Sequence, residues 1–313
     1  MDVILQLGAH RTASTSFQLY LRQSSAALGE QGVGFWGPVR LRGGMMHGVM
    51  PDALHGRGPM AFTRAQGRIA LNLQRSQQMG LGQIIVSDEN LLGKMRHNIS
   101  SHSLYPSAGE RIARMIAAFR GSVRVIHLST RCLSSYWPSA LSFCIPRGLQ
   151  VPKPERLSAL AQQPRNWRDV ITDISAAAPQ AAIFVSSYER FASRPQALLS
   201  GLLGMPAPPL GKQIWRNARP GAQDLARLPL SENELARLTA QTEGTTWQPF
   251  SRTQRAMLQE RYADDLFWLR AGADGLAHFL EDAAPAQMGY PASQRALSKG
   301  QRYDTRQNMA RPG

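Results

Sequence analysis

The chain has few cysteines and no long apolar run. Its 313 residues include two cysteines, Cys132 and Cys144, too few for a disulfide framework or a four-cysteine zinc site. No stretch approaches the roughly 18 uninterrupted apolar residues of a membrane-spanning helix, so we expect no membrane span. The N-terminus carries Asp2 where a signal peptide carries basic residues, and no cleavage site follows. These features predict a soluble, unprocessed cytoplasmic chain with reduced thiols.

Acidic residues and lysine are also scarce. The chain has 21 Asp and Glu against 36 Lys and Arg, for a formal net charge of +15. Four of the basic residues are lysine, and the other 32 are arginine. Arginine binds phosphate and sulfate through two parallel hydrogen bonds, so anionic ligands are the expected partners, with nucleic acid one of several. A hydrophobic content of 43% is enough for a real core and argues against wholesale disorder.

Short apolar strands alternate with helical patterns over residues 1–190. The strands are expected at 2–7, 84–86, 123–128 and 182–185, and the helices at 14–28, 63–79, 109–119, 132–143 and 154–177. This alternation predicts an α/β fold, a parallel sheet with helices on both faces. In such a sheet, ligands bind beyond the carboxyl ends of the strands.

Two other regions have different patterns. Residues 30–60 are rich in Gly, Met and Pro, and we expect a long loop or lid there. Residues 191–313 are expected to form a helical extension of the same single domain, with helices at 195–203, 231–241, 250–267 and 273–281. The last thirty residues are polar and basic.

The first strand leads into a turn, Gly8 to Ser16, that opens a helix. A helix N-terminus offers free backbone N–H groups and a positive dipole end, to which Arg11 adds a full charge. The ordinary nucleotide-binding P-loop needs Gly-x4-Gly-Lys-Ser/Thr, but Ala13 and Ser14 stand at its second Gly and its Lys. This departure argues against a P-loop kinase. An ordinary N-cap made by the Ser/Thr cluster remains the alternative.

A second candidate follows the third strand. Arg131 is expected at the end of that strand, and Ser139 about two turns into the next helix. An arginine and a hydroxyl so placed can hold one phosphate from two sides. Taken alone, Arg131 is more typical of a surface charge.

Together these segments resemble the sulfotransferases that use 3′-phosphoadenosine 5′-phosphosulfate (PAPS). The first loop looks like that family's 5′-phosphosulfate-binding loop, which reads Lys-Ser/Thr-Gly-Thr-Thr. The resemblance assigns cofactor binding there to Arg11, Thr12, Ala13, Ser14, Thr15 and Ser16. The spacing Arg131-x7-Ser139 is similar to the family's 3′-phosphate-binding arginine and serine.

Two weaker motifs extend the resemblance. The segment 298–303 resembles the basic loop that closes over the cofactor, with Lys299, Gly300 and Arg302 as binding residues. The segment 87–93 is similar to an acidic segment after a strand in some bacterial members. The resemblance therefore implies a P-loop NTPase-like three-layer fold, with PAPS as co-substrate and no metal.

The loop also departs from the family pattern. Arg11 replaces the lysine that stabilises charge on the leaving phosphate, and it spreads the charge over a rigid plane. Ala13 replaces a glycine and would be strained if that position needs a positive φ. Leu133 stands where the family usually has proline, two residues after the 3′-phosphate arginine.

Transfer to a hydroxyl or an amine also needs a base. Glu89 follows the second strand predicted here and is our first candidate, with His47 and His10 as second choices. The alternative is that Asp88 or Glu89 only caps the next helix. The sequence holds no metal-ligand constellation. Stacking of the adenine is left open among Trp36, Tyr136, Trp137 and Tyr303.

The leading hypothesis is a sulfotransferase that acts on a carbohydrate, a lipid or a small metabolite. The first alternative is a catalytically degenerate nucleotide- or anion-binding protein, suggested by Arg11 and Ala13. The second is a basic nucleic-acid-binding protein, suggested by the +15 charge. Nucleic acid is the less expected partner, because the arginines are scattered rather than gathered on one predicted helix.

Overall fold

The protein is built on a six-stranded sheet. The computed structural model describes residues 1–50, 58–211 and 216–281. The strand order is β2-β3-β1-β4-β5-β8, and every neighbouring pair is parallel. The strands are β1 (Asp2–Gln6), β2 (Val33–Trp36), β3 (Gln83–Ser87), β4 (Val123–Thr130), β5 (Ala182–Ser187) and β8 (His278–Leu280). The predicted α/β fold with a parallel sheet is confirmed.

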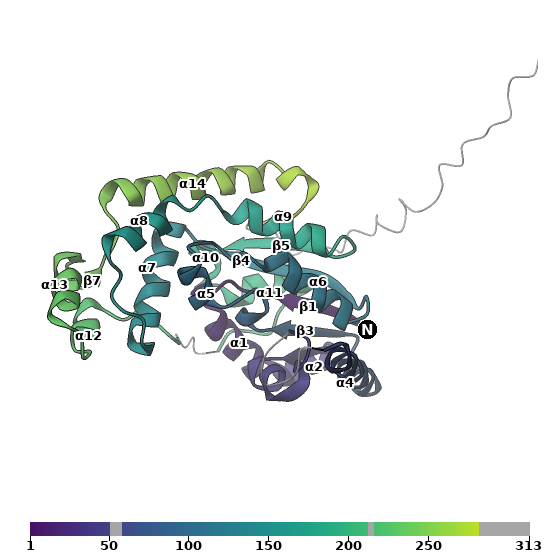
Figure 1. Cartoon of the computed structure of the whole chain (residues 1–313). Helices are drawn as coiled ribbons and strands as arrows, with labels where there is room; N and C mark the ends of the chain where they lie inside the picture. The colour runs from purple at the N-terminus through teal and green to yellow at the C-terminus, as the bar shows by residue number, and fades with distance from the viewer. Residues whose placement is uncertain (51–57, 212–215, 282–313) are drawn as a thin grey trace, which may run out of the picture.

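Helices cover both faces of this sheet (Figure 1). On one face, Ile4 packs in a cluster with α1 (Ser14–Gln23), α2 (Ser25–Glu30) and α11 (Pro195–Leu203). On the other face, Val3 and Leu5 pack in a larger cluster with four further helices. These are α4 (Pro59–Gln78), α6 (Ala108–Ala118), α7 (Leu133–Cys144) and α9 (Trp167–Ala177). Alternate residues of β1 therefore enter different cores, which makes three layers.

The segment after β5 adds short helices and one long helix. Tyr188–Phe191 forms α10, and the later elements are α12 (Ala222–Ala226), α13 (Glu232–Ala240), β6 (Thr242–Glu243), β7 (Thr246–Trp247), α14 (Arg252–Arg270) and η4 (Ala273–Gly275). Helix α14 runs past α8 (Pro154–Gln162) and α9 (Figure 1). Trp247, Leu258 and Trp268 join the larger cluster, so this segment shares the core of the sheet.

Two expectations for the segments that form the edge strands of the sheet are wrong. Residues 30–60 were expected to be a loop, but they contain β2, α3 (Pro38–Arg40) and η1 (Leu41–Met45). Residues 273–281 were expected to be a helix, but they form η4 and then β8. Both edge strands are only three or four residues long, too short for a periodic signal, and they form by pairing with β3 and β5.

The short elements between β3 and α8 complete the fold. They are η2 (Glu89–Leu91), α5 (Met95–Ser100) and η3 (Ile145–Arg147). Two of them, η2 and α5, follow the carboxyl end of β3. The turn η3 continues from the end of α7.

Candidate functional site

The loop after β1 has an unusual backbone. Gly8 has φ of 32°, and a Cβ there would lie 2.8 Å from Gln6 Nε2 and 3.2 Å from Ser14 Cβ, so only glycine fits. Arg11 and Ala13 follow with φ of 66° and 62°, in the left-handed region. A side chain in that region costs about 1–2 kcal/mol. The expected strain at Ala13 is therefore present.

Helix α1 begins at Ser14 without a side-chain cap. Its first backbone hydrogen bond runs from Phe17 N to Ala13 O, at 3.0 Å, and its first turn holds no acidic residue. The Ser/Thr cluster therefore does not act as an N-cap. The N–H groups of the first turn lie N-terminal to this bond and have no intrahelical acceptor, which leaves them able to donate to an anion.

Arg11, Arg131 and Ser139 meet beside this helix start. Arg11 Nε donates to Ser139 Oγ at 2.9 Å, and Arg131 Nη1 donates to the carbonyl oxygen of Arg11 at 2.5 Å. Arg131 Nε also donates to Ser135 Oγ at 2.9 Å, and its guanidinium lies 4.2 Å from the ring centre of Tyr188. The structure therefore brings together the residues predicted from two segments more than 100 residues apart.

The two guanidinium groups are close and partly buried, and neither forms an ion pair with a described residue. Burial, and then repulsion by Arg131, lower the pKa of Arg11 to about 10, and burial also lowers the pKa of Arg131. Among the described residues, no carboxylate lies within ion-pair distance of either group. An anion bound between them would relieve this repulsion.

A cavity of about 440 Å³ opens over this cluster. Ala13, Ser14 and Thr15 line it together with Arg11, Arg131 and Ser139. The described lining has one carboxylate, Glu89, and eight basic side chains: Arg11, Arg42, Lys94, Arg96, Arg131, Arg147, Arg216 and Arg219. The cavity is therefore strongly positive and suited to a highly charged anion.

Arg216 to Arg219 form a basic segment of the site that the sequence analysis missed. The backbone N–H of Arg216 donates to Ser16 Oγ at 3.1 Å, and Asn217 Nδ2 donates to Thr15 Oγ1 at 3.1 Å. Arg219 donates to the carbonyl oxygen of Trp247, and burial and Arg131 lower its pKa to about 10. The only signal in the sequence is two arginines before a Pro-Gly turn. The residues expected to form a basic loop over the cofactor, Lys299, Gly300 and Arg302, lie outside the described residues.

Glu89 lines the cavity, but both of its carboxylate oxygens already accept hydrogen bonds. Its Oε1 accepts from Arg42 Nη2 at 2.9 Å and its Oε2 from Gln18 Nε2 at 3.3 Å. Burial raises its pKa, but hydrogen bonds from its own backbone N–H and from Arg42 outweigh burial, so the pKa falls below its ordinary value. Asp88 is the residue that caps the next turn, by accepting from Asn90 N at 2.9 Å, and it also pairs with Arg42.

The two histidine candidates have different positions. His10 lines the cavity, with Nδ1 2.8 Å from Tyr105 Oη and Nε2 3.3 Å from Asn90 Oδ1, and burial lowers its pKa. His47 does not line the cavity, and its Nε2 lies 3.0 Å from the carbonyl oxygen of Arg42. The structure therefore separates His47 from the Arg11 cluster.

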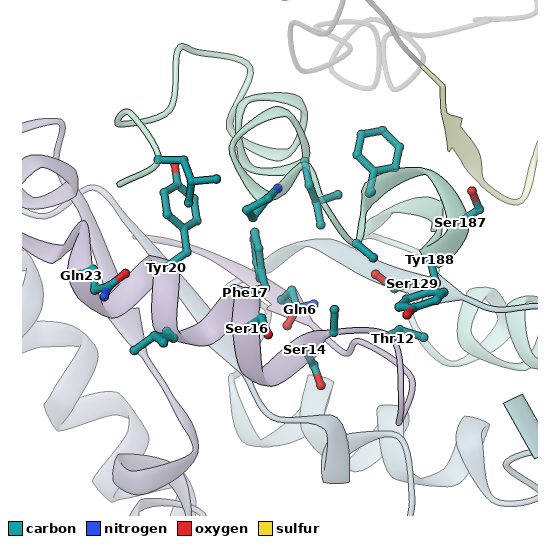
Figure 2. A pocket seen from close by; sticks show the side chains of 17 residues that line it. Gln6, Thr12, Ser14, Ser16, Phe17, Tyr20, Gln23, Ser129, Ser187 and Tyr188 are labelled. Atoms are coloured by element: carbon teal, nitrogen blue, oxygen red, sulfur yellow. The ribbon is translucent and has the colours of Figure 1, made fainter. Parts of the chain in front are cut away.

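A smaller pocket lies along α1 (Figure 2). It shares Ala13, Ser14 and Tyr188 with the larger cavity. Figure 2 shows Phe17 and Tyr20 extending from α1 into it, with Thr12 and Tyr188 towards its other end. Thr12 and Ser16 line this pocket and not the larger cavity. Its volume of about 30 Å³ is enough for roughly one water molecule, so it cannot hold a nucleotide.

The aromatic residues considered for adenine stacking are placed elsewhere. Trp36, Tyr136 and Trp137 are at most 1% exposed and belong to the core, and Tyr303 lies outside the described residues. The aromatic side chains that line the cavity within the described ranges are Phe143 and Tyr188. Tyr188 is already stacked on Arg131, and Phe143 lies against Arg11 and Arg147.

Three broader findings are independent of the cavity. Within residues 1–50, 58–211 and 216–281, no helix has the length and apolar character needed to cross a bilayer. The same ranges hold no group of three His, Cys, Asp or Glu side chains placed to bind a metal ion. Comparisons with protein-family models, with curated proteins and with solved structures give no match to this chain.

Proposed function

We propose that this protein is a PAPS-dependent sulfotransferase with a P-loop-like nucleotide site. The acceptor is a hydroxyl or an amine of a carbohydrate, a lipid or a small metabolite. The observation that carries the proposal is the meeting of Arg11, Arg131 and Ser139 at the uncapped start of α1. A nucleotide with phosphate groups at two positions needs such a paired arrangement of cations and donors.

Each part of the cluster has a role in this proposal. The N–H groups at the start of α1 and the guanidinium of Arg11 hold the 5′-phosphosulfate, while Arg131 and Ser139 hold the 3′-phosphate. During transfer, the acceptor oxygen or nitrogen bonds to sulfur as the bond from sulfur to the 5′-phosphate oxygen breaks. Arg11 stabilises the charge that develops on that phosphate, and the acceptor's proton passes to a base.

Glu89 is the proposed base. It is the single carboxylate in the described lining of the cavity, and its side chain is 20% exposed. Its ion pair with Arg42 keeps it ionised, and an ionised carboxylate can accept a proton. His10 is the second candidate, because it lines the same cavity beside Arg11. The protein is proposed to act in the cytoplasm.

A binding protein without turnover is the second candidate function. The engagement of Glu89 by Arg42 and Gln18 favours it, because a carboxylate with a lowered pKa is a weak base. Nucleic-acid binding has less support, because eight basic side chains of the described lining gather in one cavity, an arrangement suited to a compact, highly charged anion.

Calorimetry with four ligands tests the proposal. We expect 3′-phosphoadenosine 5′-phosphate (PAP), the product nucleotide, to bind about ten- to a hundredfold more tightly than AMP. ATP and a DNA duplex are the other two ligands and should bind more weakly than PAP. Equal affinity for PAP and AMP would contradict the nucleotide assignment. Release of PAP from PAPS in the presence of acceptor mixtures then separates an enzyme from a binding protein.

A further inference from the structure

One wall of the cavity carries basic side chains that the nucleotide does not need. Lys94 precedes α5, Arg96 lies in its first turn, and Arg147 ends η3. All three line the cavity and are exposed. Arg96 donates to the carbonyl oxygen of Arg147, which holds the two chain segments together. We call Lys94, Arg96 and Arg147 the basic wall.

Phe143 links the basic wall to the Arg11 cluster. The guanidinium of Arg147 lies 3.6 Å from the ring centre of Phe143, and the guanidinium of Arg11 lies 4.9 Å from the same ring centre. Arg147 also donates to the carbonyl oxygen of Phe143 at 2.7 Å. Its charge is near enough to contribute to lowering the pKa of Arg11, after burial and Arg131. The basic wall therefore adjoins the place proposed for the reacting sulfuryl group.

The described lining of the cavity carries more positive charges than a bisphosphate nucleotide carries negative charges. Of the eight basic side chains in the described lining, Arg42 pairs with Asp88 and Glu89. A bisphosphate nucleotide carries about three to four negative charges at neutral pH. Arg11, Arg131, Arg216 and Arg219 match that number. The basic wall remains, and none of its members has an ion-pair partner among the described residues.

We propose that the basic wall binds an anionic group of the acceptor, so that the substrate class is an acidic molecule. Its carboxylate, phosphate or sulfate group lies against Arg96 and Arg147, and its hydroxyl or amine lies towards Arg11 and Glu89. This assignment of the acceptor rests on the proposed sulfotransferase function. The anion-binding property of the wall rests on the cavity alone.

Thermal unfolding of the PAP-saturated protein tests this proposal without a known acceptor. Sodium sulfate, sodium phosphate and sodium acetate are each added at constant ionic strength, with sodium chloride as the reference. A ligand that binds the folded protein raises the Tm. We expect at least one of the three anions to raise it. Because sulfate and phosphate also raise the Tm by exclusion from the protein surface, the anion whose effect is lost in the double variant described next identifies the acidic group. Saturation with PAP keeps these anions out of the two phosphate positions of the nucleotide site.

The double variant Arg96→Gln, Arg147→Gln is the decisive comparison. Both side chains are exposed, so the variant should fold, and the concentration of anion that produces a given rise in Tm should increase at least tenfold. The matched control is Arg124→Gln, Arg252→Gln, which removes the same charge from exposed positions that do not line the cavity. The control should respond like the wild type.

Two outcomes would overturn the proposal. One is a wild-type protein that responds to all three anions as it does to chloride. The other is a double variant that responds like the wild type. Failure of PAP to bind at all would count against the sulfotransferase function instead, and it is measured separately by calorimetry. The anion response without PAP then shows whether the basic wall binds anions independently of the nucleotide.

Discussion

The side chain of Arg131 donates a hydrogen bond to the backbone carbonyl of Arg11, 120 residues away along the chain. The two guanidinium groups are thereby held close together at the carboxyl ends of β1 and β4, where the loops after these neighbouring strands meet. Like charges in this position repel each other, so an anion that binds between them stabilises the folded protein. The first two predictions depend on this contact.

Two replacements of Arg11 test whether its positive charge or the shape of its guanidinium group is needed. Arg11→Ala should weaken PAP binding at least tenfold and abolish transfer, because it removes the cation of the loop and the hydrogen bond to Ser139. Arg11→Lys, which keeps the positive charge but not the planar guanidinium, should retain transfer. Calorimetry and a PAPS turnover assay give both results. Transfer at the wild-type rate by Arg11→Ala would show that Arg11 has no part in the reaction.

Arg131 should control the preference for a 3′-phosphate. Arg131→Gln should reduce the ratio of PAP affinity to AMP affinity from the expected ten- to hundredfold to about one, because AMP lacks the group that this arginine holds. Arg124→Gln is the matched control, since Arg124 lies at the other end of β4. If Arg131→Gln still binds PAP ten- to a hundredfold more tightly than AMP, other cations of the cavity bind the 3′-phosphate.

Glu89→Gln should reduce the transfer rate about 10²- to 10⁴-fold and leave PAP affinity nearly unchanged. The glutamine keeps the size of the side chain but cannot take the acceptor's proton. Because the hydrogen bonds from its backbone and from Arg42 hold the pKa of Glu89 below its ordinary value, the wild-type rate should stay level as the pH falls to 5.

His47→Ala is the comparison variant for Glu89 and should have a much smaller effect, since His47 lies outside the cavity lining. If Glu89→Gln is active and the wild-type rate falls as the pH drops through 6, the base is a histidine, and His10→Gln identifies it.

Ala13→Gly should stabilise the protein by up to about 1 kcal/mol. Alanine at φ of 62° is strained, and glycine is not, although glycine gives up part of this gain through the greater entropy of the unfolded chain. Ala113→Gly, at an exposed position inside α6, should instead destabilise by about 0.5–1 kcal/mol. Urea unfolding measures both. A loss of stability in Ala13→Gly would mean that its methyl group packs favourably enough to outweigh the strain.

His127 should make the protein sensitive to acid. It is fully buried in β4, and burial lowers its pKa to about 3. Below pH 6.5 the unfolded chain takes up a proton that the folded chain does not, so the free energy of unfolding falls as the pH drops from 6.5 towards 3. His127→Leu removes this contribution, and its free energy of unfolding should vary less over that range. Equal slopes for variant and wild type would contradict the prediction.

Local patterns in the sequence determined the centre of the sheet and the turn after β1. Short apolar runs specify β1, β3, β4 and β5, because a strand buried on both faces needs such a run. Gly8 marks the turn, because only glycine fits beside Gln6 and Ser14. The spacing from Arg131 to Ser139 is also local, since Arg131 lies two residues before α7 and Ser139 lies within that helix. These features depend on neighbours in the chain, so the sequence alone predicts them.

Only the tertiary structure decided the edges of the sheet and most of the cavity wall. The edge strands β2 and β8 exist because β3 and β5 offer them hydrogen-bond partners. Arg216 to Arg219 reach α1 across about 200 residues of chain, and Arg42 reaches Glu89 across 47. Such contacts leave no periodic pattern in the sequence, because their geometry depends on how distant segments pack. The same packing places the basic wall inside the cavity and His47 outside it.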